Sequence, residues 1–341
     1  MIFELRALTD IWTGGADRSN DKLHLSGLKG SLRWWYEALV RDLGAKPCDP
    51  TDKGIIRCTL DPKKLDRSLP RKEQLKEIKG MMCPSCYFFG CTGWSGKVQL
   101  RVWTSQNDGQ KHIVLDSLEV NDSFVLEFIP LKQIEQAEQD LVNALLKLIV
   151  DYGALGAKTV FKPSEIDFKN TKLHHRNFGI VAWANENARP RDEISVPDIR
   201  KYLGSFKAVK QCNEWPNLNK FWFVKGKHLT RTEHNEIVGR DSSGRYINLS
   251  GSNTEKNVFL GGFISRDKAR FTDPMRKKYR DFNAASKKIF SFHGPAPIER
   301  CFGYVPQNDS VGDFVAEVIR KFPKKFSEAD FQKGDAIISS L

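Results

Sequence analysis

A stretch near the N-terminus, residues 27–36, combines an apolar helical stripe with a file of charged side chains. The apolar residues recur at helical spacing: Leu28, Leu32, Trp35 and Leu39. Because residues three or four apart share one face of an α-helix, we expect these side chains to pack against a sheet. Lys29 and Arg33 lie one turn apart on another face, and Ser26 is the expected N-cap. The first domain is therefore expected to form around this helix.

Lys29 and Arg33 near a helix start are typical of a phosphate site. The free backbone N–H groups at a helix N-terminus attract anions, and a nearby Lys and Arg add charge and donors. The alternative is that Arg33 pairs with Glu37, four residues on, as part of a solvated surface. Both interpretations stay open from this stretch alone.

The apolar patterns of the first half predict six main elements in the order βαββαβ. They are a strand at 2–8, a helix to about 43, strands at 97–104 and 117–129, a helix at 132–150 and a strand at 178–184. This is the order of a ferredoxin-like domain, in which both helices cover one face of an antiparallel sheet. RNA-recognition modules bind RNA on the other face. We predict an α+β fold with a first domain at 1–185, interrupted by a polar insertion at about 47–80.

The second half, residues 186–341, is predicted to form another domain with a weaker pattern. Helices are expected at 196–210 and 311–321, and strands at 221–225 and 257–264. No apolar run approaches the roughly 20 residues that a membrane span needs, and the N-terminus lacks the layout of a secretory signal. The seven cysteines are an odd, clustered set, so we expect reduced thiols and a cytoplasmic protein.

The net charge of +12 favours a polyanionic partner, most often nucleic acid. Half of that excess falls in residues 261–290, where aromatic residues are interleaved with the cations. Aromatic side chains among cations are typical of single-strand binding, since bases stack on the rings. Arg276 and Lys277 are the candidate contacts in this segment, against the alternative of an ordinary solvated surface.

Cys83 and Cys86 form a C-x-x-C pair with Cys91 close behind, and Cys48 or Cys58 offers a fourth thiol. A structural zinc site normally shows two such pairs, and this chain has one. We therefore expect no bound metal and no other cofactor, with zinc as the alternative.

Four motifs resemble those of a known family in their order and spacing. They are IWTGGAD at 11–17, GLKGSLRWW at 27–35, YFFGCTGW at 87–94 and GALGAKT at 153–159. The chain is thereby similar to the RAMP superfamily, the ferredoxin-like RNA-binding proteins of CRISPR systems. Within it, the likeness is greatest to the first-numbered subunits of Cmr, or type III-B, effector complexes. Lys29 stands where the family has Arg. This keeps the positive charge but loses the two parallel hydrogen bonds that a guanidinium can donate.

The resemblance implies two tandem ferredoxin-like, RRM-like domains with insertions. It also implies membership of a multi-subunit antiviral ribonucleoprotein that binds CRISPR guide RNA and complementary target RNA, with this subunit toward the 3′ region of the guide. The implied role is binding without catalysis, beside other subunits and without a membrane. The candidate RNA contacts are Gly14, Gly15, Lys29, Arg33, Lys97, Gly156, Lys158, Arg276 and Lys277.

Two other functions remain open. Some relatives cleave CRISPR RNA with a histidine general base, and His24 or His174 would take that role here. No carboxylate in the sequence pattern is paired with either histidine. A scaffold that binds only proteins is the other alternative, with Trp215 and Trp222 as exposed anchors.

Overall fold

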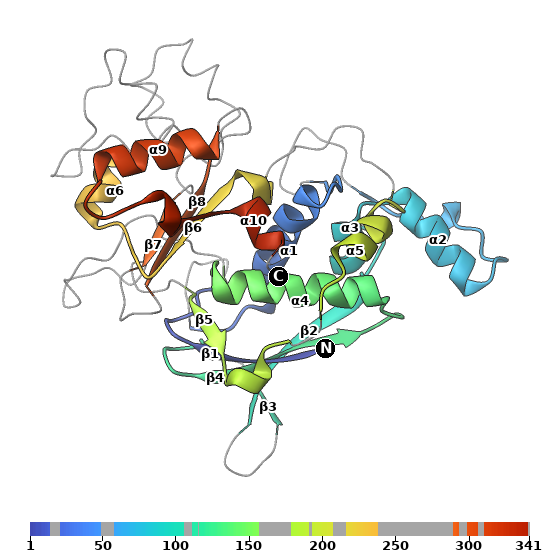
Figure 1. Ribbon diagram of the computed structural model, residues 1–341. Helices are drawn as coiled ribbons and strands as arrows, with labels where there is room; N and C mark the ends of the chain where they lie inside the picture. The colour runs from blue at the N-terminus through green and yellow to red at the C-terminus, as the bar shows by residue number, and fades with distance from the viewer. Residues whose placement is uncertain are drawn as a thin grey trace, which may run out of the picture. The chain divides into compact units, whose positions relative to one another are not determined.

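The computed structural model describes residues 1–13, 21–48, 58–105, 111–114, 116–156, 179–190, 193–206, 216–237, 289–292, 299–305 and 310–339. The chain divides into two compact units (Figure 1). The first comprises Met1–Ala157, Gly179–Leu218 and Ile338–Leu341, and the second Lys158–Phe178 and Asn219–Ile337. The predicted domain boundary at 185/186 falls inside the first unit.

The first unit contains a five-stranded sheet in the order β3-β2-β4-β1-β5, and all its neighbouring strands are antiparallel. Its strands are β1 (Ile2–Ala7), β2 (Val98–Ser105), β3 (Lys111–Ile113), β4 (Ser123–Pro130) and β5 (Val181–Trp183). β4 begins six residues later than the predicted 117 because a tight turn precedes it. In that turn Asn121 has a φ of 74°, and the N–H of Asp122 donates to the carbonyl of Glu119 at 3.2 Å.

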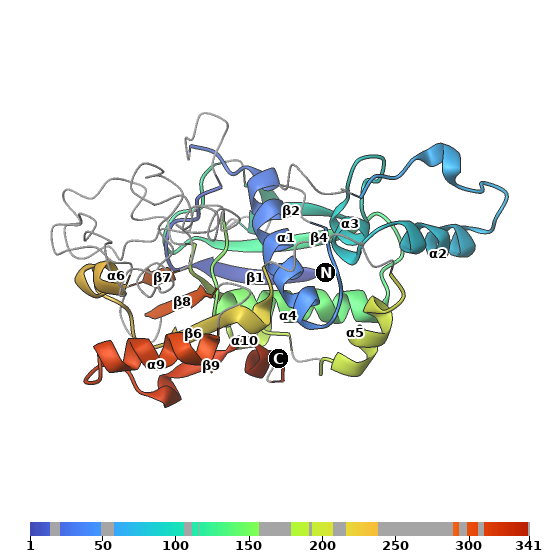
Figure 2. The same ribbon diagram turned by 90° about the horizontal axis from the view of Figure 1, so that it is seen from above.

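Helices α1 (Leu25–Asp42) and α4 (Gln136–Asp151) lie on the same side of this sheet (Figures 1 and 2). The apolar stripe predicted for α1 is confirmed, because its four members are at most 2% exposed. On the sheet, Phe124, Leu126 and Phe128 alternate along β4 and are equally buried. The apolar stripe of the helix, with a period of 3.6 residues, therefore packs in one core with the apolar face of the strand, which has a period of 2.

The start of α1 corrects one prediction. Its N-cap is His24 and not Ser26, which is already inside the helix. The backbone N–H of His24 donates to Thr13 Oγ1 at 2.8 Å, so a side chain from the segment after β1 fixes the entry to the helix.

The interval predicted as an insertion contains ordered structure beyond residue 58. It includes a 3₁₀ turn at Pro62–Lys64 and α2 (Arg71–Met81), after which α3 (Pro84–Phe89) follows. α5 (Val196–Leu203) belongs to the first unit because the Tyr202 hydroxyl donates to Glu138 Oε1 on α4 at 2.6 Å. Ser195 caps α5 as expected, and a further 3₁₀ turn spans Glu186–Ala188.

The second unit contains a four-stranded antiparallel sheet in the order β7-β8-β6-β9. Its elements are 3₁₀ turns at Leu218–Lys220 and Glu328–Asp330, β6 (Phe221–Lys225), α6 (Arg231–Ile237), β7 (Ile289–Phe292), β8 (Arg300–Tyr304), α9 (Val311–Lys321), β9 (Phe331–Lys333) and α10 (Gly334–Ile338). The predicted strand at 221–225 and helix at 311–321 are confirmed, whereas the strand predicted at 257–264 lies outside the described residues. Trp222 of β6 stacks on Phe314 of α9 with ring centroids 4.9 Å apart, which ties helix to sheet.

From the first to the last strand of its sheet, the second unit has its described α-helices and strands in the order β-α-β-β-α-β, and the first unit adds α2, α3 and β3 to that order. When the strands are numbered within each unit and β3 is left out of the count, both sheets have the strand order fourth-first-third-second, and β3 extends the first sheet at the edge beside β2. Among the described helices, none combines the length and the hydropathy that a membrane crossing requires.

Candidate nucleic-acid interface

Two segments meet at the N-terminal half of α1 in the first unit. The N–H of Gly156, after α4, donates to Ser31 Oγ on α1 at 3.0 Å. The indole N–H of Trp35 donates to the carbonyl of Ala154 at 2.9 Å. The start of α1 and the glycine-containing segment after α4 therefore lie side by side.

The glycines at this junction permit close packing of the chain against itself. A Cβ on Gly27 would lie 2.2 Å from the carbonyl oxygen of Thr13. A Cβ on Gly156 would lie 2.7 Å from the carbonyl oxygen of Trp12, and Gly156 has a φ of +116° that side-chain-bearing residues rarely adopt. Gly156 thus has a packing role at a site where we predicted an RNA contact.

Lys29 lines a shallow cavity of about 260 Å³ between the start of α1 and the start of β2. Ser26, Ser95 and Gln99 contribute polar atoms to its lining, and Leu131 contributes apolar surface. Burial, and to a lesser degree repulsion from Arg33, lowers the pKa of Lys29. Lys29 has no ion-pair or hydrogen-bond partner within the part of the chain that the structure describes. A half-buried ammonium group without an anion is a good phosphate ligand.

Arg33 is instead engaged by the protein itself. Its guanidinium donates to Glu37 Oε1 at 2.8 Å, to the carbonyl of Gly90 at 3.0 Å and to Cys86 Sγ at 3.2 Å. Burial opposes the charge, but Glu37 and Cys86 outweigh it and raise the pKa of Arg33. The Arg33–Glu37 pair that we weighed as solvated surface does form, and it is largely buried. Arg33 consequently holds α1 to α3 and is a weaker candidate for an RNA contact.

Lys97 is a core residue, only 1% exposed. Its Nζ forms an ion pair with Glu138 of α4, which is fully buried, and lies 5.1 Å from the ring centroid of Tyr87. A buried ammonium paired with a carboxylate is not accessible to a phosphate in this conformation, so Lys97 is not a candidate RNA contact.

Lys132 is a cation at this surface that the sequence analysis missed. Its Nζ donates to Ser95 Oγ at 2.9 Å and to the carbonyl of Gly96 at 2.6 Å, and it lies 4.1 Å from the Trp94 ring. Ser95 also lines the cavity of Lys29, so one turn connects the two lysines. The available signal was the Trp94-Ser95-Gly96 segment before β2, which supplies the ring and the acceptors that Lys132 contacts.

The open face of the first sheet carries charges of both signs. Glu4 and Arg6 are exposed on β1, and Arg101 lies 3.9 Å from Glu127 across β2 and β4. The indole N–H of Trp103 donates to the same Glu127 carboxylate at 3.2 Å. Counted over its described residues, this face therefore lacks the excess of positive charge that RNA backbone binding uses, and the α1 side is the better candidate.

Several predicted residues fall outside the described part of the chain: Gly14, Gly15, Lys158, Arg276, Lys277, His174 and Trp215. His24 is described, and its Nε2 is buried without a hydrogen-bond partner among the described residues. Trp222 is 1% exposed in the core of the second unit, so its expected role as an exposed anchor is wrong.

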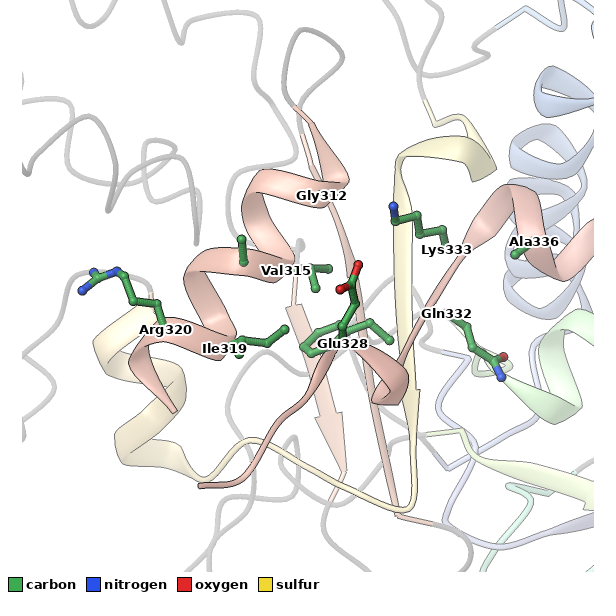
Figure 3. Close-up of a pocket in the computed structure, with 10 residues that line it drawn as sticks. Gly312, Val315, Ile319, Arg320, Glu328, Gln332, Lys333 and Ala336 are labelled. Carbon is green, nitrogen blue, oxygen red and sulfur yellow. The ribbon is translucent and has the colours of Figure 1, made fainter. Parts of the chain in front are cut away.

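A larger cavity, about 590 Å³, lies in the second unit between α9 and β9 (Figure 3). Val315, Ile319 and Phe331 give it apolar walls. Arg320 at its edge is paired with Glu317 at 2.6 Å, so this cation is already neutralised. Lys333 and Glu328 also line this cavity, so its mainly apolar walls carry charged side chains of both signs.

The protein thus has a mixed α+β fold with two antiparallel sheets. Two lysines, Lys29 and Lys132, lie near the start of α1. Residues 4–161 match the model of the RAMP superfamily, which confirms for this part of the chain the resemblance carried by the four motifs. No curated protein matches the sequence.

Two of the solved structures that are similar to the chain match it at low identity. Cmr1 from Pyrococcus furiosus, in its apo form, is 10% identical with a TM-score of 0.40, and the match covers 98% of each chain. A chain of a type IV-B CRISPR complex is 12% identical with a TM-score of 0.31, and the match covers 59% of this chain and 96% of that one.

Proposed function

We propose that this protein is a non-catalytic RNA-binding subunit of a type III-B CRISPR ribonucleoprotein. It would contact the 3′ region of the guide RNA, or the guide–target duplex, beside other subunits of the assembly. The observation that carries the proposal is Lys29, a cation that lines a cavity at the start of α1 and has no ion-pair partner among the described residues, within the segment that matches the RAMP superfamily. The shared element and strand orders support two tandem ferredoxin-like domains as its framework.

Phosphate binding at this junction follows from its charges. Neutralising a phosphate with Lys releases condensed counterions, which supplies most sequence-independent affinity for nucleic acid. Lys29 and Lys132 flank the turn that contains Ser95, so neighbouring phosphates of one RNA strand could contact both lysines. The net charge of +12 adds long-range attraction.

Replacing Lys29 by Ala should weaken RNA binding about tenfold, since a hydrogen bond to a charged group contributes about 1.5 kcal/mol. The loss should be uniform across RNA sequences, and the slope of log affinity against log salt should fall by about 1. Fluorescence anisotropy with labelled single-stranded and duplex RNA measures both quantities.

Lys72→Ala is the matched control, because it removes the same charge from an exposed position on α2. We expect its affinity and salt slope to stay near those of the wild type. Equal affinities for the wild type and Lys29→Ala, at the same salt, would remove Lys29 from the interface.

A metal-independent ribonuclease is the second candidate, because His24 Nε2 is buried and unpartnered beside the start of α1, within the described residues. General-base catalysis requires such a nitrogen within reach of the attacking 2′-hydroxyl. Labelled guide RNA incubated with the wild type should remain intact under our proposal. Cleavage by the wild type that disappears in His24→Ala would establish the ribonuclease instead.

A further inference from the structure

Four cysteines from two separate stretches of the chain converge in the first unit. The Sγ atoms of Cys48, Cys58, Cys83 and Cys86 all lie within 4.8 Å of one another. Cys48 Sγ is 3.3 Å from Cys86 Sγ and 3.7 Å from Cys83 Sγ. Cys48 follows α1, Cys58 precedes the 3₁₀ turn at Pro62–Lys64, and the other two stand at the start of α3.

The spacing of these sulfurs fits one tetrahedral ion. Zinc–sulfur bonds of about 2.3 Å at tetrahedral angles place neighbouring sulfurs about 3.8 Å apart. Two of the separations, 3.3 and 3.7 Å, are close to that value and far longer than a disulfide bond. A cluster of several iron atoms would need sulfurs that stand farther apart.

The surroundings supply donors that stabilise thiolate ligands. Backbone N–H groups point at two of the sulfurs: those of Cys48 and Cys86 donate to Cys83 Sγ at 3.4 and 3.5 Å, and that of Cys83 donates to Cys58 Sγ at 3.4 Å. Arg33 donates to Cys86 Sγ at 3.2 Å. Such contacts orient metal ligands and tune their charge. They also give the Arg33 guanidinium a role that does not involve RNA.

We propose that Cys48, Cys58, Cys83 and Cys86 bind one structural Zn²⁺ ion. The ion would displace the thiol protons, and four thiolates around Zn²⁺ leave a charge of −2 that Arg33 partly offsets. A set of four protein ligands leaves no open position for substrate, which is typical of structural sites and not of catalytic ones.

The site would stabilise a small core that is separate from the main sheet. The four cysteines lie in a cluster with Leu60, Ile78, Met82 and Tyr87. Small clusters bury little apolar surface, and metal ligation is a common way to stabilise them. The zinc would fasten the end of α1 and the segment before the 3₁₀ turn to α3.

The test is the metal content of the full chain, purified under reducing conditions from cells grown with zinc. We expect one zinc per chain by elemental analysis and by native mass spectrometry, and fewer than one-tenth as much in Cys48→Ser and Cys86→Ser. Cys301→Ser is the matched control, because Cys301 is buried in the second unit, and its zinc content should equal that of the wild type. Cys91→Ser removes the neighbouring thiol outside the set of four and should also keep its zinc.

A second measurement does not depend on the variants folding. Wild-type protein prepared with Co²⁺ in place of zinc should show the visible absorption of tetrahedral cobalt–thiolate coordination. Wild-type protein that contains no metal, contains iron instead of zinc, or carries a disulfide among these four cysteines would overturn the proposal. Zinc that is retained in Cys48→Ser and in Cys86→Ser would overturn this assignment of ligands.

Discussion

Replacing Lys97 by Ala is expected to destabilise the first unit by about 3–5 kcal/mol, because breaking a buried ion pair leaves one charge uncompensated. Glu138 would be that charge: it is fully buried and otherwise accepts from the Tyr202 hydroxyl and from the backbone N–H of Glu135. Urea unfolding measures the loss in the free energy of unfolding. Hydrogen-exchange protection of α4 shows whether that loss falls in the first unit, which contains the pair.

A paired substitution separates the ion pair from the loss of packing. Lys97→Met with Glu138→Gln removes both charges while keeping the approximate volume, so it should recover a large part of the stability lost in Lys97→Ala. Lys72→Ala, on the surface, should change the free energy of unfolding by no more than about 0.5 kcal/mol. A loss below about 1 kcal/mol in Lys97→Ala would mean that Lys97 is not buried against Glu138.

Two glycines three residues apart on α1 are expected to respond to alanine with opposite signs. Gly27→Ala should destabilise by about 1–3 kcal/mol, since inserting an atom into a packed site forces the backbone to shift. Its Cβ would lie 2.2 Å from the Thr13 carbonyl oxygen, which belongs to the main chain and cannot rotate away. Gly30→Ala should instead stabilise by about 0.5–1 kcal/mol, because alanine restricts the unfolded chain.

The second substitution is the control for the first, since both add one methyl group to the same helix. At Gly30 nothing lies within 4 Å of the added Cβ. Thermal unfolding of the two variants beside the wild type is sufficient. Equal effects of the same sign would contradict the packing of Thr13 against the start of α1.

Local patterns in the sequence were sufficient for the framework of the first unit. The stripe in α1 and the alternation along β2 are set by neighbouring residues, so α1, α4 and every strand of the first sheet except β3 were predictable. The exact cap was not, because the partner of the His24 N–H is Thr13, eleven residues earlier. α3 was missed because only six residues form it, too few for a periodic pattern.

The roles of individual side chains depended on distant partners. Lys97 was a candidate RNA contact, but its partner Glu138 is 41 residues away and holds it in the core. Arg33 had a local partner, Glu37, but its contacts with Cys86 and Gly90 come from a segment more than 50 residues later. Charge and spacing identify a cation, whereas burial decides whether a ligand can approach it.

The cysteine cluster likewise depends on residues that are distant in the sequence. One C-x-x-C pair argued for no metal, since a second pair is the usual sequence signal. The second pair is Cys48 and Cys58, ten positions apart, which the spacing rule does not recognise. Only the fold brings these two thiols to the start of α3.

The central claim, that this protein binds RNA through phosphate contacts, is tested most directly by a salt series. Gel shifts of the purified wild-type protein with single-stranded and duplex RNA should show binding that weakens about tenfold between 50 and 200 mM salt if two phosphates are neutralised. Binding that is absent at low salt, or that does not change across the series, would contradict it.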